Sequence, residues 1–218
     1  MSGVDAYFLR FENPSVKIIL AGIVIATHPD AIRCLKPLKL SDDAGLKVIE
    51  FLATPISGLL GVVPLDSLHA QRVLIKMNRF LFHNKNIIDK NGYDFHLILT
   101  SQRLHTGRAP NLHKWIGYTY YGSVCPEHDK RSRLMPLGAI VDERQDTYQT
   151  IGAHEIAHML EIDHDVSLTC RDGYIMSKYI ITYSNSYDWS ECSKTELQKT
   201  FESEKFSCLR KWPQFSIN

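Results

Sequence analysis

The sequence predicts an α/β fold, in which short apolar strands alternate with helices and a small irregular part follows. Two observations lead to this class. Apolar residues form three runs of strand length, at 16–26, 93–101 and 134–142. Segments with apolar residues at helical spacing lie between and after these runs. Because the chain changes to turns after residue 165, we expect one domain, 1–218, with an upper part, 1–165, and a lower part, 166–218.

Length and charge narrow the class of protein. A chain of 218 residues, 44% hydrophobic and 22% charged, can bury the core of one globular domain. The formal net charge of +1 gives no reason to expect nucleic acid or an anionic membrane as a partner. The longest apolar run, VKIILAGIVIA at 16–26, is too short to cross a bilayer and contains Lys17. We interpret this run as a buried strand. We also expect the protein to be a monomer.

The first half of the chain predicts two helices around a region of loops. Residues 5–12 are typical of the end of an amphipathic helix, with an apolar face of Tyr7, Phe8 and Phe11. The proline-containing segment 29–66 predicts loops, with a short helix near 43–52. A second helix is expected to begin at Asp66 or Ser67, either of which can cap it. Its apolar residues repeat at helical spacing: Leu68, Val73, Leu74, Met77, Phe80 and Leu81.

The middle of the chain predicts two strands and a connection. Residues 93–101, YDFHLILTS, are typical of a strand. Residues 102–133 are polar and aromatic, which indicates a long surface connection. The strand at 134–142, LMPLGAIVD, contains Pro136 and is therefore expected at an edge of the sheet.

Two further helices are expected near the C-terminus. Asp146 precedes the helix TYQTIGAHEIAHML. Ser193 is expected to cap a final helix at 194–203, because Glu196 stands three residues later and completes a capping box.

The segment HEIAHMLEIDHD, residues 154–165, has the spacing of a metal site. His154 and His158 are four residues apart and share one face of a helix. Glu155 lies beside them and can reach a water on the same ion, the H-E-x-x-H arrangement of zinc peptidases. His164 can join them only if the chain turns after the helix. Three nitrogens and a water would then complete an open, tetrahedral catalytic site.

Two other readings compete with the catalytic one. The histidines could be surface or packing residues, but a third histidine after H-E-x-x-H makes a chance match much rarer. A structural zinc site is disfavoured, because such sites are closed by four protein ligands. His96 and His113 lack a partner at ligand spacing and are expected to be unrelated to metal.

These residues resemble the metzincin zinc peptidases, in which a methionine-bearing turn follows the third histidine, as YIMS does here. Within that group the chain resembles the reprolysin branch (adamalysin, snake-venom and ADAM-type), and most closely its arthropod salivary or venom members. Asp165, directly after the last histidine, is one mark of the branch. The others are the segments YDFHLILTS, GSVC, GAIVDE and ECSKTELQKTFESEKFSCL. The resemblance covers residues 93–210 and extends towards residue 5.

The resemblance implies a zincin fold. Such a fold has a mixed twisted β-sheet with an antiparallel edge strand, a long zinc-binding helix, and a small irregular C-terminal subdomain with the methionine turn and a terminal helix. The family has a strand before the position of Met1, so we expect an N-terminal strand to be missing. Residues 16–26 would then expose an unpaired edge, and the chain by itself would be poorly soluble.

The resemblance also assigns roles to individual residues. It implies zinc as the cofactor, Glu155 as the general base, and three zinc ligands: His154, His158 and His164. Met176 would form the hydrophobic floor of the site; otherwise it is a core methionine. The implied disulfides are Cys125–Cys208 and Cys170–Cys192, the alternative being free thiols. Cys34 stands alone.

The function that the resemblance implies is hydrolysis of peptide bonds in protein or peptide substrates. Substrate would lie extended along the edge strand 134–142. A pocket near 177–187 would receive an apolar side chain. A calcium site found in many relatives is not expected here, because Lys211 stands near the position of its asparagine ligand.

The cysteines and the N-terminus point to different compartments. The opening residues, MSGVDAYFLRFENP, lack the apolar region of a secretory signal, which by itself indicates the cytosol. Four of the five cysteines lie in the half with the zinc motif, and together with the resemblance they indicate a secreted protein.

Glu161 departs from the family, which has glycine at this position. We expect the backbone to keep a left-handed turn here, at a cost of about 1–2 kcal/mol. The alternative is a longer helix that misplaces His164. Glu161 and the missing strand therefore leave a rival function open: a catalytically impaired, metzincin-like secreted binding protein. The complete His and Glu set opposes it.

Overall fold

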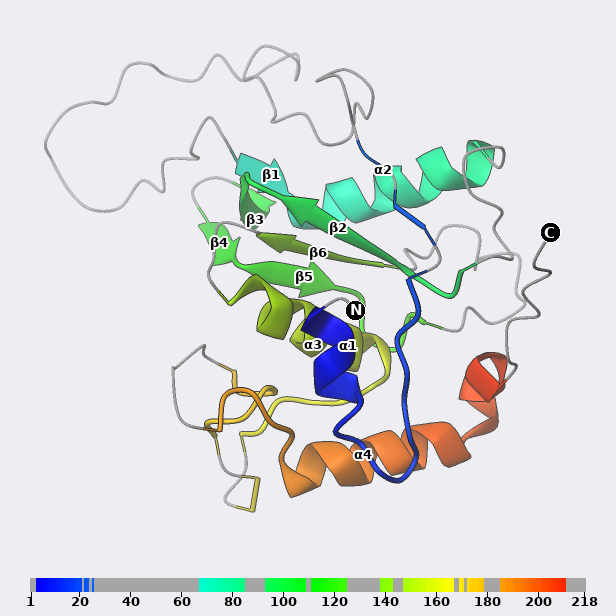
Figure 1. Cartoon of the computed structure of the whole chain (residues 1–218). Coiled ribbons are helices and arrows are strands. Elements are labelled where there is room, and N and C mark those ends of the chain that lie inside the picture. The colour runs from blue at the N-terminus through cyan, green and yellow to red at the C-terminus, as the bar shows by residue number, and fades with distance from the viewer. Residues whose placement is uncertain are drawn as a thin grey trace, which may run out of the picture.

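The computed structural model places two small sheets and three longer helices around the segment with the histidines (Figure 1). Within the described residues, no helix is long and apolar enough to cross a membrane. Cys34 and the helix expected near 43–52 lie outside the described part of the chain. The described residues are 3–20, 22–23, 25, 67–84, 93–108, 111–124, 138–142, 147–166, 169–170, 172–178 and 185–210.

One sheet lies directly against the histidine helix. It has the order β2-β6-β5, formed by His96–Thr100, Gly138–Asp142 and Gly117–Thr119. β2 runs parallel to β6, and β5 runs antiparallel to it. The prediction that 134–142 is an edge strand is therefore wrong, because β6 is paired on both sides. Pro136 lies outside the described residues, and the strand begins only at Gly138, so no proline interrupts the ladder.

Two strands of the second sheet lie within the segment that was predicted to be a surface connection. β1 (Ser67–His69) runs parallel to β3 (Arg103–Arg108), and β3 pairs with the antiparallel strand β4 (Asn111–Trp115). Together with β5, these strands fill much of 102–133, so that prediction is wrong. Short strands with one face towards water keep many polar residues, which is why composition indicated a loop.

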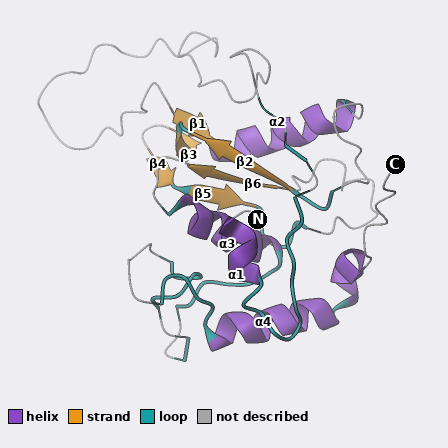
Figure 2. Ribbon diagram, in the orientation of Figure 1, coloured by secondary structure: helices purple, strands orange, loops and turns teal. Residues whose placement is uncertain are grey.

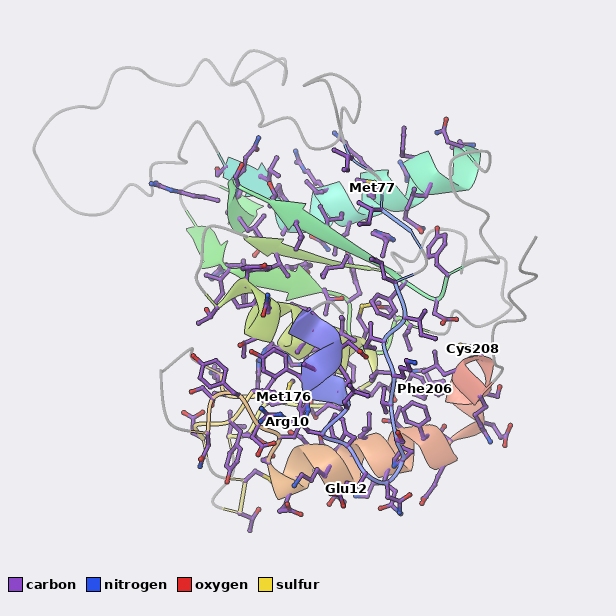
Figure 3. All side chains as sticks on the ribbon, in the orientation of Figure 1. Arg10, Glu12, Met77, Met176, Phe206 and Cys208 are labelled. Carbon is purple, nitrogen blue, oxygen red and sulfur yellow. A yellow bond between two sulfur atoms is a disulfide. The ribbon has the colours of Figure 1, made fainter. Side chains whose placement is uncertain are left out.

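α2 (Ala70–His83) covers the sheets from above (Figure 1). It begins later than predicted, because Ser67–His69 pairs with β3 instead of entering the helix. His69 is the N-cap, and its Nδ1 accepts a hydrogen bond from the Arg72 amide at 3.4 Å. The apolar face packs into one cluster, and Figure 3 shows Met77 in it. The cluster contains Leu68, Ala70, Val73, Leu74, Met77, Leu81, Ile98 and Leu104.

The lower half of the molecule contains the remaining helices: α1 (Gly3–Phe8), α3 (Tyr148–Met159), α4 (Glu191–Glu202) and the 3-10 helix η3 (Glu204–Arg210). Figure 2 shows α3 between the sheet above and α4 below, joined by long loops. The second core cluster lies here. Its largest side chain, Trp189, is 1% exposed, stacks on Phe11 at 4.7 Å between ring centroids, and donates from Nε1 to the Tyr7 carbonyl at 2.8 Å.

α4 begins three residues before the predicted start. Ser190 is the N-cap, and its Oγ accepts from the Ser193 amide at 3.0 Å. Ser193 is buried inside the helix, so its predicted role as the cap is wrong. Glu196 does not complete a capping box; instead its carboxylate accepts from the Asp163 amide at 2.8 Å. Ser190 and Ser193 are both residues that commonly cap helices, so the sequence did not decide between them. In the fold Ser190 is the cap, and its hydroxyl also contacts Asp165.

The run at 16–26 does not form the predicted buried strand in its described residues, 16–20, 22–23 and 25. Leu20, Ile23 and Ile25 are 66%, 70% and 75% exposed. The Ile18 amide donates to the Asp5 carboxylate at 2.9 Å and not to a neighbouring strand. An apolar run becomes a strand only where another strand accepts its hydrogen bonds, and no such ladder is formed by these residues.

Candidate metal centre

α3 carries the first two histidines, and it is buried on most sides. The side chain of its N-cap, Thr147, makes no capping hydrogen bond, and the predicted Asp146 lies outside the described residues. Small residues allow close packing: a Cβ on Gly152 would lie 3.3 Å from Val4 of α1. Tertiary packing therefore fixes this helix more than capping does. The buried residues are Ile151, Gly152, Ala153, Glu155, Ile156, Ala157 and Met159.

The Nε2 atoms of three histidines converge on one point. His164 Nε2 lies 3.1 Å from both His154 Nε2 and His158 Nε2. One ligand atom from each histidine lies within 4.8 Å of the others. Zinc–nitrogen bonds of about 2.0–2.1 Å in a tetrahedral site place neighbouring nitrogens about 3.3 Å apart. The donor set therefore fits a zinc ion that keeps one open position.

Hydrogen bonds fix which ring nitrogen faces this point. His154 Nδ1 donates to the Ile175 carbonyl at 2.7 Å, and His158 Nδ1 donates to the Ile162 carbonyl at 2.8 Å. A carbonyl can only accept, so each Nδ1 carries the proton and each Nε2 offers a lone pair. Burial, assisted by the neighbouring histidines, lowers the pKa of His154 to about 3 and that of His158 to about 4. Both rings are therefore neutral, as metal ligands must be.

A sharp turn delivers His164. α3 ends at Met159, and Glu161 has φ +64°, so the expected left-handed turn is confirmed. The Glu161 amide donates to the His158 carbonyl at 3.1 Å, and the Ile162 amide donates to the Ala157 carbonyl at 3.0 Å. This pair of bonds is the Schellman motif, which usually has glycine at the left-handed position.

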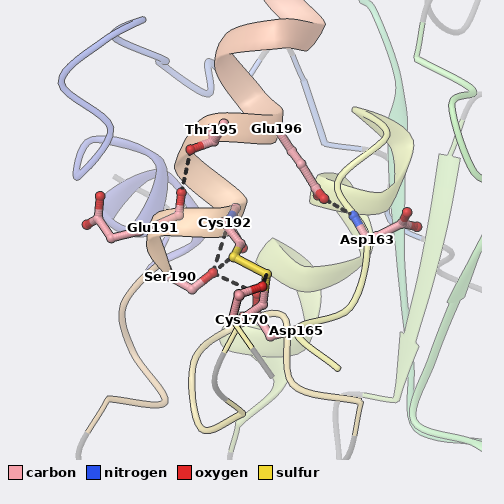
Figure 4. The surroundings of a disulfide bond; sticks show 10 residues. Asp163, Asp165, Cys170, Ser190, Glu191, Cys192, Thr195 and Glu196 are labelled. Carbon is pink, nitrogen blue, oxygen red and sulfur yellow. Dashed lines mark hydrogen bonds between the residues drawn. A yellow bond between two sulfur atoms is a disulfide. The ribbon is translucent and has the colours of Figure 1, made fainter. Parts of the chain in front are cut away.

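A buried network joins the segment of His164 to Met176 and α4 (Figure 4). The Asp165 amide donates to the Met176 carbonyl at 2.8 Å, and the Asp165 carboxylate accepts from Ser190 Oγ at 2.7 Å. Met176 is fully buried. The predicted disulfide Cys170–Cys192 is formed beside this network.

The second predicted disulfide is only partly within the described chain. Cys208, on η3, is disulfide-bonded, whereas Cys125 lies outside the described residues. Its pairing with Cys125 therefore stays a prediction. Part of the predicted pocket at 177–187 and Lys211 also lie outside the described residues.

Glu155 lies between the histidines and the sheet. It is 7% exposed, and burial raises the pKa of its carboxyl to about 8. Its carboxylate packs against the backbone of β5, since a Cβ built on Gly117 would be 2.6 Å from Glu155 Oε1. A nearby divalent cation favours the ionised carboxylate. The arrangement places one acidic side chain between three potential metal ligands and the end strand of the sheet.

Gly117 was not identified from the sequence, where a single glycine in the segment WIGYTYY gives no signal. We expect Gly117→Ala to displace the Glu155 carboxylate. If the centre hydrolyses peptides, as the resemblance implies, cleavage should fall by about ten- to a hundred-fold, because small misplacements of reacting groups are costly. Zinc content should stay unchanged, since the atoms nearest to the added Cβ belong to Glu155 and Ile151 and not to the histidines. Steady-state cleavage and metal analysis of both proteins would check this. Full activity in the alanine variant would show that Glu155 has room to move.

His96 is a buried histidine outside the centre. Both of its ring nitrogens are buried without a hydrogen-bond partner, and burial lowers its pKa to about 4. It lies against Gly138, where a Cβ would be 2.5 Å from the ring. The histidine cluster found among the described residues consists of His154, His158 and His164, and the expectation that His96 is unrelated to metal stays a prediction.

The lowered pKa of His96 predicts acid destabilisation. The unfolded chain takes up this proton below about pH 6.5, whereas the folded protein takes it up only near pH 4. The contribution of His96 to the free energy of unfolding is therefore fully present above about pH 6.5. It is lost as pH falls towards 4, and the loss is about 2 kcal/mol at pH 5. Denaturant melts at pH 7 and pH 5 should show that this loss is smaller in His96→Phe. The exposed His113 provides the control, His113→Phe, and equal losses in all three proteins would contradict the assignment.

An H-E-x-x-H helix, a turn that returns a third histidine and a buried methionine form the arrangement that is typical of metzincin zinc peptidases. The model of the Reprolysin (M12B) family of zinc metalloproteases matches residues 68–213. The chain belongs to this family.

Several curated relatives match nearly the whole chain. A protein of Bombyx mori named "A disintegrin and metalloproteinase with thrombospondin motifs like" is 24% identical and is matched over 97% of this chain and 29% of its own length. Venom metalloproteinase 3 of Eulophus pennicornis is 22% identical over 96% of this chain and 44% of its own length. Venom metalloproteinase 1 of the same species is also 22% identical, over 96% of this chain and 42% of its own length. The chain therefore spans less than half the length of these relatives.

Proposed function

We propose that this protein is a zinc-dependent endopeptidase that hydrolyses peptide bonds in protein substrates. The observation that carries the proposal is the convergence of three Nε2 lone pairs beside the buried Glu155 carboxylate. Family membership supports zinc as the metal and peptide hydrolysis as the reaction.

The proposed chemistry divides between a metal and one carboxylate. His154, His158 and His164 would hold the zinc through Nε2. When bound, the ion supplies Lewis-acid activation of a water and of the scissile carbonyl. Glu155 accepts a proton from the water while the water oxygen forms a bond to the carbonyl carbon of the substrate. The same carboxyl then gives that proton to the leaving nitrogen as the C–N bond breaks.

The hydrogen bonds behind the histidines support this chemistry. The carbonyls of Ile175 and Ile162 accept hydrogen bonds that orient the rings of His154 and His158. Such outer partners fix ring orientation and raise ligand basicity. We assign Met176, buried beneath this region, as the hydrophobic floor of the centre.

Substrate would bind along β5 rather than along 134–142. Among the described strands, β5 pairs only with β6 and lies at the end of the sheet. An extended peptide can add to such an edge through backbone hydrogen bonds. Gly117 brings this strand against Glu155, so a peptide bond held on its outer edge would lie near the carboxylate.

We further propose that 1–218 is one catalytic domain of a secreted protein. The Cys170–Cys192 disulfide and the disulfide at Cys208 support an oxidising compartment. Two of the relatives carry the word venom in their names, which also supports export. The expected partners are protein or peptide substrates, with neither nucleic acid nor membrane required, and the expected state is a monomer.

The rival function, a catalytically impaired binding protein, rested on Glu161 and on the N-terminal strand that was expected to be missing; the structure bears on the first of these. That residue adopts the left-handed turn, and His164 reaches the other two histidines. One experiment distinguishes the two functions. Zinc-loaded protein is incubated with an unfolded protein substrate, and the products are identified by mass spectrometry. An endopeptidase produces internal cuts. Substrate that stays intact while zinc remains bound would favour the binding protein.

A further inference from the structure

The Glu161 side chain has a partner of its own. Its Oε1 forms an ion pair with Lys205 Nζ, which belongs to η3, the segment that follows α4. The two side chains are 32% and 35% exposed, so water screens the pair only in part. Glu161 thus connects the turn after α3 directly to the C-terminal helical segment that contains Cys208.

The chain that follows β5 holds the same turn from another side. Tyr121 donates from its hydroxyl to the Glu161 carbonyl at 2.7 Å, and its ring centroid lies 6.3 Å from that of His158. The Gly122 amide donates to the His158 carbonyl at 3.0 Å. A Cβ on Gly122 would lie 2.5 Å from Glu161 Oε1 and 3.0 Å from Lys205 Nζ. Gly122, at φ +63°, therefore leaves the space that the ion pair occupies.

This turn determines how two of the three histidines are presented. The Ile162 carbonyl, next to Glu161, accepts from His158 Nδ1, and His164 follows two residues later. Thr200 of α4 adds a hydrogen bond from Oγ1 to the Leu160 carbonyl at 2.8 Å. Contacts from three different segments therefore meet on the residues between the histidines.

We propose that Tyr121, Glu161 and Lys205 form a turn clamp that positions His158 and His164 for zinc. A residue other than glycine is strained at φ +64°, and the clamp holds the backbone there against that strain. A glycine would reach this backbone conformation through its own flexibility. Glu161 is held in it by contacts that link the turn to the chain after β5 and to η3. The inference rests on the proposed function, because it assumes that these histidines bind zinc. Because the three residues are argued to act through His158 and His164, they are positioning residues.

The central experiment measures zinc affinity by competition with a chelator in four proteins: wild type, Lys205→Met, Glu161→Gln and the double variant. We expect each single variant to bind zinc about three- to ten-fold more weakly, and the double variant to be no weaker than either, because both remove one interaction. High salt should lower the affinity of the wild type towards that of Lys205→Met and leave Lys205→Met unchanged.

Lys194→Met is the matched control. Lys194 also pairs with a glutamate, Glu191, at 2.7 Å, but that pair lies three residues apart on α4 and does not contact the turn. Its loss should leave zinc affinity unchanged. The absorption spectrum of the cobalt-substituted protein gives a second readout, since a shifted His158 or His164 alters the ligand field. Lys205→Arg should preserve both readouts.

Glu161→Gly in the Lys205→Met background separates positioning from a general loss of stability. Glycine occupies φ +64° without strain, so it should restore at least part of the lost zinc affinity. Unchanged affinity in Lys205→Met, or additive losses in the double variant, would overturn the clamp while leaving the proposed function intact. A wild-type protein that takes up no zinc would overturn the proposed function, and the clamp with it.

Discussion

Glu155→Gln is expected to lower peptide cleavage by about a hundred- to ten-thousand-fold, the range for loss of a general base, and to leave one zinc bound per chain. Glu155 lies beside His154 on α3, but the three converging ligand atoms all belong to histidines. Glutamine keeps the shape of the side chain and cannot accept the proton of the attacking water. The measurements are steady-state cleavage of a peptide substrate and metal analysis of the purified variant.

The paired control is His164→Ala, which removes a ligand instead of the base. That variant should lose both zinc and cleavage. If Glu155→Gln loses its zinc to the same extent, Glu155 is a ligand and the division of roles is wrong. If Glu155→Gln cleaves as the wild type does, another group is the base.

Replacing the Cys170–Cys192 pair with serines is expected to lower the free energy of unfolding by about 3 kcal/mol. The estimate follows from chain entropy for the loop of 22 residues that the bond closes. For a chain of this size, that loss corresponds to a fall in Tm of about 6–12 °C. The loop contains Ile175, whose carbonyl orients His154, so zinc affinity should fall as well.

Thermal melts with and without zinc would check this result. Cys34→Ser is the control, because the sequence assigns no partner to Cys34, and its melt should match the wild type. A double-serine variant that melts with the wild type and binds zinc equally well would contradict the structural role of the bond.

The sequence was most informative where spacing along one helix decides the outcome. His154 and His158, four residues apart, share a helix face whatever surrounds them. A left-handed backbone was expected at Glu161 because the chain must turn to return His164 and because the family resembled has glycine at this position. The observed φ of +64° confirms it. The disulfide Cys170–Cys192 followed from resemblance and not from spacing.

The sequence was least informative where pairing between distant segments decides the outcome. Residues 103–108 and 111–115 form strands because they pair with each other and with β1, and their own composition does not reveal this. The central place of β6 depends on β5, which is only Gly117–Thr119. Ser190 rather than Ser193 caps α4 because Asp165 also binds the Ser190 hydroxyl. Such contacts are tertiary, and local patterns cannot contain them.

The contacts of Glu161 are also made with distant parts of the chain, so its local sequence did not predict them. Its carbonyl and carboxylate meet Tyr121 and Lys205, which are 40 and 44 residues away in the sequence. Read alone, a glutamate in place of glycine predicts only strain. The folded chain adds a hydrogen bond, an ion pair and the space left by Gly122.

Metal content measured together with chelator-sensitive cleavage tests the central claim most directly. The protein is purified without added metal, analysed for zinc, and then assayed on a generic protein substrate before and after treatment with a zinc chelator. We expect about one zinc per chain, matching the single histidine cluster of the described residues, and cleavage that the chelator abolishes and added zinc restores. Cleavage that persists in fully zinc-free protein, or a protein that binds no zinc at all, would contradict the account.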